Sequence, residues 1–539
     1  MKSQRSHAPG SLRVVAALGA IILLAAVPTG AAAHHNGFRT TSPAFVSLEK
    51  GIRGSVIPLV NSGEKIRGEV FEGLPDGIGV APAHPDRVTP SSHPRYVDLY
   101  VAHEQSHVPF GLTATSVFAD FQDSSVSRVR VDTNSKRIKN LTVALSPDLG
   151  FIRFCSATMV GPNEGFANYK FLVNEESNDV IPVPGGAPYG SDPGTGAGLR
   201  QAGYSAVLNT QTGHVGVLEG AGRMNHENLV VVPGWRSGVF GLTGDDTFTS
   251  PSTVDRPNLS QMYMYSAGSN RRFLGGDGHL WAFRVTRTNA GAVDPADPQN
   301  DANDFFEINV GDNWKGEFIR VPDAVAEGTT GDKPQDALED WSNANNVFQF
   351  IRIEDIAYDP DHPRKVYFTD TGNSRLLEDP GTGRLYRAPS GTAGTSSSSS
   401  RVFKMVMSKN DPTRVKVFKV LTEASDLGMR SPDNIAVGRK SIMVQEDTSS
   451  YSKIWRYDLR AKTWTHVATA TQEPAETSGI VDVSRWFGSG WWALDVQSHT
   501  DQKVGMSYLT WTGPTPPGGD QYRLHRENGQ LLLMHLPGS

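Results

Sequence analysis

Acidic residues recur at similar places along this sequence, each directly before or after a short run of apolar residues. Four of these motifs stand upstream of apolar segments: His226-Glu227-Asn228, Arg352-Ile353-Glu354-Asp355, Ser431-Pro432-Asp433-Asn434 and Glu476-Thr477-Ser478-Gly479. Oxygen ligands from Asp, Glu and Asn suit hard cations, and calcium, which takes roughly six to eight of them, is the best match. If the fold brings the motifs together, cations must cancel their repulsion, so the sequence predicts a calcium site.

Each acid taken alone has a simpler interpretation, because Asp and Glu are mostly solvated surface residues. The set favours a shared site, since similar placement recurs along the chain. The histidines beside Glu104 and Glu227 are interpreted as structural and are assigned no chemistry.

The elements that must position these acids are short strands. One pattern, an apolar or aromatic run that ends in an acidic residue, occurs six times: Val97–Glu104, Tyr169–Glu176, Val239–Asp246, Lys365–Asp370, Ser441–Asp447 and Trp491–Asp495. Further short strands are predicted between them at Ser127–Val131, Gln261–Tyr265, His279–Val285, Arg401–Met407 and Lys453–Tyr457. Six units of a few strands each predict an all-β fold, a six-bladed β-propeller with loop insertions.

This architecture predicts where the acids meet. The apolar runs Leu229–Val232, Ile356–Tyr358 and Ile435–Val437 each directly follow an acidic motif. If they are innermost strands, the residues before them lie at one rim of the central channel. Three segments rich in Gly, Pro, Asp or Ser are expected to be exposed loops: Pro182–Gly198, Gly291–Asp304 and Thr392–Ser400.

Composition excludes some classes of protein. The 539 residues are 38% hydrophobic and 20% charged, with a formal net charge of −6. A nucleic-acid-binding protein usually shows a basic patch, and none is visible, so nucleic acid is not expected as a partner. The 55 Gly and 34 Pro residues suit a chain that turns often between short strands.

The first 33 residues are predicted to be a secretory signal peptide. Lys2, Arg5 and Arg13 are followed by the apolar run Val14–Val27 and by an Ala-x-Ala cleavage site at Ala31–Ala33. A membrane anchor is the alternative, but the apolar run is shorter than the roughly 20 residues that span a bilayer. The expected mature protein, residues 34–539, is a single propeller domain. It is expected to be secreted, extracellular or periplasmic, to have no membrane partner after signal cleavage, and to be a monomer.

Six short motifs, in this order, resemble one known family. They are Asn174-Glu175-Glu176, Gly222–Glu227, Asp245-Asp246 with Gln261–Tyr265, Arg352–Ala357, Pro432-Asp433-Asn434 and Glu476–Gly479. The chain is similar, from about Val97 to His499, to the PhoX-type alkaline phosphatases. That family consists of six-bladed propellers which hydrolyse phosphate monoesters at a calcium and iron cluster in the channel.

The resemblance implies roles for individual residues. It implies metal ligands at Glu175, Glu176, Glu227, Glu354 and Asp433, with Glu104 as a further candidate. It implies catalytic roles for Arg352 and Glu354. Arg352 would grip the substrate phosphate, because a planar guanidinium can donate two hydrogen bonds to phosphate oxygens. The expected partner is a small-molecule phosphate ester.

Two departures from the family bear on the metal. Asn174 stands where the family has a cysteine that binds iron, and asparagine supplies no sulfur ligand. The single cysteine, Cys155, lies well upstream and is interpreted as a small buried hydrophobe; a lone cysteine also excludes an internal disulfide. Where the family commonly has a twin-arginine export signal, this chain has only Arg13 before the apolar run. We therefore expect calcium without iron.

Two alternative functions stay open at this stage. The first is a calcium-dependent lactonase, since such propellers also ring calcium with Glu, Asn and Asp. The second is a non-catalytic extracellular propeller in which calcium only stabilises the channel.

Overall fold

The computed structural model describes residues 37–84, 93–104, 124–178, 180–182, 199–247, 259–294, 297, 302–330, 333–381, 383–388, 399–498 and 528–539. The predicted signal peptide at 1–33, with its boundary to the predicted propeller domain, lies outside these ranges. So does most of the predicted loops Pro182–Gly198 and Thr392–Ser400, and part of Gly291–Asp304.

Antiparallel sheets account for most of the described chain. The first sheet contains β5 (Pro75–Pro82), β6 (Tyr96–His103), β7 (Ser125–Asp132) and β8 (Arg137–Leu145). The second contains β9 (Phe154–Val160), β10 (Lys170–Glu175), β13 (Ser205–Asn209) and β14 (Val215–Val217).

A nine-stranded sheet joins two four-stranded arrays. One array is β15 (His226–Val231), β16 (Val239–Asp245), β17 (Met262–Ala267) and β18 (His279–Arg287). The other is β20 (Ile353–Asp359), β21 (His362–Asn373), β24 (Ser399–Met407) and β25 (Arg414–Glu423). Strand β19 (Trp314–Arg320) pairs with both β18 and β25 and so connects their outer edges.

Two further sheets include strands from the N-terminal part of the chain. One contains β26 (Pro432–Val437), β27 (Ser441–Glu446), β28 (Lys453–Asp458), β29 (Thr463–Ala470) and β1 (Val46–Leu48). The other contains β30 (Ala475–Asp482), β31 (Trp491–Ser498), β32 (Asn528–His535) and β2 (Ser55–Asn61). Because β2 pairs with β32, strands from the two ends of the chain complete one sheet.

The remaining elements are short. The two-stranded pairs are β3 (Lys65–Ile66) with β4 (Glu69–Val70), β11 (Val180–Pro182) with β12 (Leu199–Gln201), and β22 (Leu376–Glu378) with β23 (Leu385–Arg387). The helices are α1 (Asn270–Leu274), α2 (Asp323–Ala326), α3 (Pro334–Ala344) and α4 (Ser484–Phe487). In the part of the chain that the structure describes, no helix is long and apolar enough to cross a membrane.

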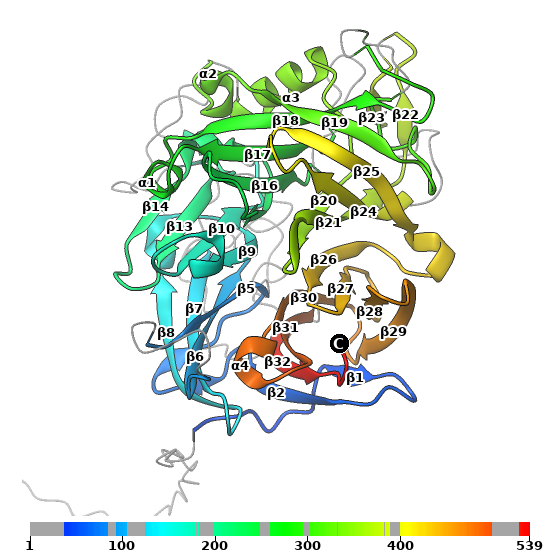
Figure 1. The fold of residues 1–539 in the computed structure, drawn as a ribbon. Coiled ribbons are helices and arrows are strands. Elements are labelled where there is room, and N and C mark those ends of the chain that lie inside the picture. Colours follow the sequence, from blue (N-terminus) through cyan, green and yellow to red (C-terminus); the bar gives the residue numbers. More distant parts are fainter. Residues whose placement is uncertain are drawn as a thin grey trace, which may run out of the picture. The chain divides into compact units, whose positions relative to one another are not determined.

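The first strands of these arrays contact one another in a closed cycle. In order, β5 contacts β9, β9 contacts β15, β15 contacts β20, β20 contacts β26, β26 contacts β30, and β30 contacts β5 again (Figure 1). A cycle of inner strands with sheets extending outward is a β-propeller, so the predicted fold class is confirmed. Six inner strands are what six blades require, although the blade number itself stays a prediction.

The apolar core lies between neighbouring sheets. Phe171 of β10, for example, packs against Tyr100 of β6, with ring centroids 5.8 Å apart. A Cβ atom on Gly79 of β5 would lie only 2.7 Å from the Phe171 ring. Glycine therefore lets the first two sheets approach closely, which brings β5 and β9 side by side at the channel.

The predicted strands are also confirmed in their order. Each of the six acid-ended runs forms the second strand of its array: β6, β10, β16, β21, β27 and β31. The apolar runs after the acidic motifs lie in the inner strands β15, β20 and β26, as predicted.

Candidate metal centre

Several inner strands share an irregularity where an acidic residue stands. In each, the pairing register shifts across two residues, the first of them acidic: Asp76-Gly77 in β5, Glu227-Asn228 in β15, Glu354-Asp355 in β20 and Asp433-Asn434 in β26. An extra residue in one strand bends that strand and redirects its side chain. The local backbone thus takes these acids out of the regular alternation of the sheet.

Three overlapping groups of potential metal ligands lie here. Within each group, ligand atoms lie within 4.8 Å of one another. The groups are Asp76, Glu104 and Cys155; then Cys155, Glu176 and Glu227; then Glu227, Asp246 and Glu354. Since Cys155 and Glu227 each belong to two groups, the seven residues form one continuous set, called here the carboxylate cluster. All seven are buried except Glu104, which is half-buried.

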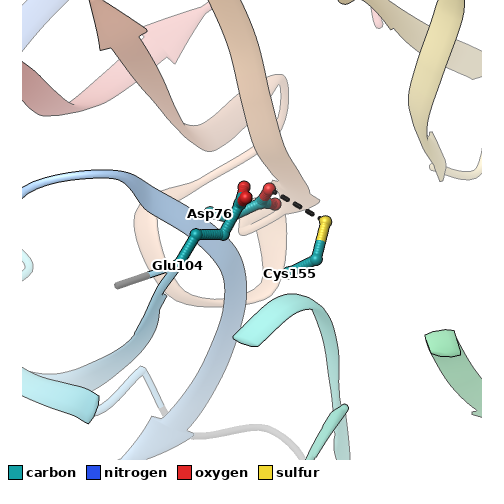
Figure 2. A group of neighbouring side chains, drawn as sticks. All are labelled: Asp76, Glu104 and Cys155. Carbon is teal, nitrogen blue, oxygen red and sulfur yellow. Dashed lines mark hydrogen bonds between the residues drawn. The ribbon is translucent and has the colours of Figure 1, made fainter. Parts of the chain in front are cut away.

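Cys155 is buried, as expected, and it also connects the two ends of the cluster. Its thiol donates to Asp76 Oδ2 at 3.3 Å and lies 3.9 Å from Glu227 Oε2. Figure 2 shows the thiol pointing toward Asp76, with the Glu104 carboxylate beside it. A sulfur atom is therefore present among the carboxylates, although it comes from β9 and not from position 174.

Four of the predicted ligands, Glu104, Glu176, Glu227 and Glu354, lie in the carboxylate cluster. Glu227 Oε2 accepts a hydrogen bond from Ser156 Oγ at 2.7 Å, and Glu104 Oε1 accepts one from Gln497 Nε2 at 2.5 Å. Whether these residues bind metal stays a prediction.

Glu175, by contrast, is engaged elsewhere. Its carboxylate forms a buried ion pair with Arg200, at 2.9 and 3.1 Å, and accepts backbone N–H groups of Ile152, Gly203 and Tyr204. These bonds occupy both oxygens, so the structure does not bring Glu175 to the other predicted ligands. The preceding Asn174 donates to the backbone oxygen of Glu227 at 2.6 Å and accepts from Ser205 Oγ.

Arg352 connects two acids of the cluster. Its Nε and Nη2 atoms donate to the two oxygens of Asp246 at 2.8 and 2.9 Å, and Nη2 lies 3.1 Å from Glu354 Oε1. The Asp246 side chain is completely buried, while 18% of the Arg352 side chain is exposed. The guanidinium therefore holds two potential ligands in place and also reaches the accessible edge of the cluster.

Several buried carboxylate oxygens have no hydrogen-bond partner among the described residues. They are Asp76 Oδ1, Glu227 Oε1, Glu354 Oε1, Asp355 Oδ1 and both oxygens of Asp495, which stands on β31 and is completely buried. Buried polar atoms are nearly always paired, and an unpaired buried charge is costly. A cation bound between the carboxylates would satisfy these oxygens, so the residues present fit a metal site.

Burial and mutual repulsion raise the pKa values of these acids. Burial is the largest cause for Asp76, Glu176, Glu227 and Glu354, and the next is the negative charge of another acid of the cluster. Asp433 also has a raised pKa, caused first by burial and then by Glu354. Asp433 therefore lies near the cluster, although it belongs to none of the three groups.

The donor set suits more than one kind of ion. Carboxylates favour calcium, as predicted, whereas a thiolate favours a softer metal. Burial raises the pKa of the Cys155 thiol, so a nearby metal ion is needed to deprotonate it.

Sequence reasoning missed Asp76, Cys155, Asp246 and Asp495 as potential ligands. Asp246 and Asp495 end two of the recognised runs, and Asp76 stands in Pro75-Asp76-Gly77, which matches Pro432-Asp433-Asn434 in its first two residues. That repeated Pro-Asp pair is the signal that could have identified Asp76. For Cys155, no pattern in the sequence indicates proximity to Asp76.

Comparisons with known proteins agree with this architecture. The family model described as alkaline phosphatase PhoX matches residues 210–476. Among solved structures, the chain is similar to Pseudomonas fluorescens PhoX in complex with vanadate, a transition state analogue. The two are 14% identical, and the match covers 93% of this chain and 98% of that one with a TM-score of 0.54. At that identity the likeness shows the fold alone.

More distant similarities carry no functional argument. The PQQ-bound aldose sugar dehydrogenase of Streptomyces coelicolor is 12% identical, with a TM-score of 0.34 over 90% of this chain and 99% of that one. A luciferin-regenerating enzyme is 7% identical, with a TM-score of 0.38 over 89% and 96% of the two chains. Curated protein sequences give no match.

Proposed function

Because this chain belongs to the PhoX family of alkaline phosphatases, we propose that it is an exported, calcium-dependent hydrolase of phosphate monoesters. Family membership supports phosphoric ester hydrolysis as the class of reaction. Export rests on the predicted signal peptide at residues 1–33, and calcium rests on the chemistry of the carboxylate cluster.

The observation that carries the proposal is the set of unpartnered buried oxygens in and beside the cluster. Glu227 shows this most clearly, because it belongs to two ligand groups and its Oε1 has no hydrogen-bond partner in the described chain. A carboxylate in this position is stable in its ionised form only when a cation lies next to it.

The residues divide between holding ions and positioning ligands. We propose that Asp76, Glu104, Glu176, Glu227, Asp246, Glu354 and Asp433 hold divalent cations. When bound, such ions neutralise the charge of the phosphoryl group and activate an oxygen nucleophile. Arg352 keeps Asp246 and Glu354 in place through its ion pairs and contributes positive charge beside the phosphoryl oxygens. Glu175 is not kept among the proposed ligands, since Arg200 and backbone amides occupy it.

Cys155 alters the expectation about iron. The sulfur that Asn174 cannot supply is present in the same cluster, 3.3 Å from Asp76 and 3.9 Å from Glu227. We propose calcium as the principal ion, with Cys155 as the ligand of any iron that the protein holds.

The test is hydrolysis of an aryl phosphate by the purified protein, with calcium, with a chelator, and after calcium is restored. We expect turnover that is lost on chelation and regained with calcium. The Glu227→Gln variant should lose most of it, whereas Glu69→Gln, at an exposed site on β4, should not. Absence of calcium-dependent turnover would contradict the proposal, and a lactone substrate in parallel would identify the alternative hydrolase.

A further inference from the structure

Arg352 lies directly before the inner strand β20, where the sheet does not yet hold the backbone. β20 begins at Ile353, whose partner in the ladder is Asp370 of β21. The completely buried carboxylate of Asp370 holds this segment instead. Its Oδ2 atom accepts from the backbone N–H of Ile351 at 2.9 Å, and Oδ1 accepts from that of Arg352 at 3.1 Å. Since the Arg352 oxygen accepts from the N–H of Thr371 at 2.9 Å, both backbone polar groups of Arg352 are bonded to residues 370 and 371.

The position of Asp370 recurs in other arrays. In five of them the residue that pairs with the first residue of the inner strand is polar and buried: His103, Glu175, Asp245, Asp370 and Glu446. Glu175 accepts the backbone N–H of Ile152, two residues before β9, at 3.0 Å. Glu446 accepts that of Arg430, two residues before β26, at 2.9 Å. Asp370 does the same two residues before β20, so this hydrogen bond is a repeated feature of the fold.

The residue directly before the inner strand differs between these arrays. Where the acid is glutamate, this residue has a left-handed backbone, with φ of 49° at Arg153 and 42° at Ser431. Where the acid is aspartate, at Arg352 and Asn225, φ is negative. The left-handed conformation costs a residue with a side chain about 1–2 kcal/mol and sends that side chain in another direction. The length of the acid therefore goes together with the backbone conformation, and at Asp370 the second oxygen accepts the N–H of this residue itself.

The backbone conformation of Arg352 directs its side chain to its partners. The guanidinium donates to both oxygens of Asp246 at 2.8 and 2.9 Å and lies 3.1 Å from Glu354. Asp246 is fixed from its own side, because its backbone N–H and oxygen both form hydrogen bonds with Asn225, at 2.9 and 2.7 Å. A pairing through two parallel bonds needs both groups placed to within about 0.5 Å. A changed backbone at Arg352 would break it.

We propose that Asp370 is a positioning residue, whose carboxylate sets the backbone conformation of Arg352 and so places the guanidinium against Asp246 and beside the substrate phosphoryl group. The inference rests on the proposed function, because Arg352 supplies the positive charge of that site. Asp370 acts through Arg352 and not as a metal ligand, since both its oxygens accept backbone N–H groups.

The first test is a crystal structure of the calcium-loaded Asp370→Glu variant. This variant should fold, because glutamate already occupies the equivalent position in two other arrays. It keeps the charge and the bond two residues before the strand, but the longer side chain should give Arg352 the left-handed φ of its counterparts in those arrays. We expect the guanidinium to move away from Asp246.

A second variant and a control accompany it. Asp370→Asn places an amide donor against a backbone N–H, so it should also displace Arg352. If that variant does not fold, the glutamate variant decides alone. Glu175→Gln, the matched change at the equivalent position of another array, should leave Arg352 paired with Asp246.

Hydrolysis of an aryl phosphate separates positioning from a structural role. Asp370→Glu should lower kcat about 10- to 100-fold with a smaller change in KM, because a displacement of about 1 Å can cost that much. In an Arg352→Gln background the same change should lower kcat further by no more than about 2-fold, because the group that it positions is gone. A structural residue would lower kcat by the same factor in both backgrounds.

Two results would overturn the inference. One is an Arg352 that stays paired with Asp246 in every folded variant at position 370. The other is a pair of effects on kcat that multiply in the double variant. A wild type that hydrolyses no phosphate ester would count against the proposed function, and the crystal structures would still decide whether Asp370 places Arg352.

Discussion

Replacing Glu227 with glutamine should stabilise the calcium-free protein and reduce the stabilisation that calcium brings. Glutamine has nearly the shape of a protonated glutamate, so the change removes one buried charge with little change in packing. In a chelator, the wild type bears the repulsion around a completely buried acid whose Oε1 is unpartnered among the described residues. Relief of that cost should stabilise the calcium-free variant by about 1–3 kcal/mol.

Calcium should stabilise the wild type more than the variant. A ligand at about 100 times its Kd stabilises the folded state by about 2.7 kcal/mol. If the loss of Glu227 weakens binding about 100-fold, the same calcium concentration gives the variant only about 0.4 kcal/mol. The calcium-induced stabilisation should therefore fall by about 2.3 kcal/mol. An unfolding entropy of about 2 cal/mol/K per residue over roughly 500 residues makes this a difference of about 2 °C in Tm.

The assay is differential scanning calorimetry of the wild type, Glu227→Gln and the control Glu69→Gln, first in a chelator and then along a calcium titration. The reasoning predicts a higher Tm for Glu227→Gln in the chelator and a smaller rise with calcium. A variant that responds to calcium like the wild type would refute the placement of Glu227 at a cation.

Four other outcomes are expected. Arg352→Ala should lower Tm and cost about 3–5 kcal/mol of stability, because it removes the guanidinium group that pairs with two buried acids. Calorimetry that shows no loss of stability would contradict this. Glu175→Gln should destabilise the protein by breaking the buried ion pair with Arg200, yet leave calcium affinity by titration unchanged, unlike Glu227→Gln. Stability in a chelator should fall as pH rises from about 4 to 7, because burial raises the pKa of Asp370 from 3.8 to about 7 and the unfolded state loses that proton first. This group alone contributes about 4 kcal/mol to the change. A denaturation series in which the free energy of unfolding rises over this pH range would disprove the prediction. Cys155→Ser should leave calcium content intact and abolish any iron content, so elemental analysis that finds iron retained would exclude the thiol as its ligand.

The sequence was most informative where a local pattern repeats. Runs such as Lys365–Asp370, a short apolar stretch that ends in an acid, are typical of a strand, and each forms the second strand of its array. The acids Glu227 and Glu354 were placed correctly next to inner strands, because an acidic motif directly before an apolar run marks where such a strand begins.

The remainder depended on contacts that no local pattern records. Glu175 and Glu176 are adjacent in the sequence, yet only Glu176 joins the cluster, because Glu175 meets Arg200 from the other side of a long insertion. Cys155 and Asp76 are 79 residues apart and meet because glycines let β5 and β9 pack closely. Pairing of β2 with β32 likewise depends on the closure of the whole fold.

The central claim is that the carboxylate cluster holds divalent cations, and elemental analysis of the purified protein tests it most directly. After exchange into metal-free buffer, the wild type should retain at least one calcium ion per chain, and Glu227→Gln should retain less. A wild-type protein that is folded and active but contains no divalent metal would contradict the account.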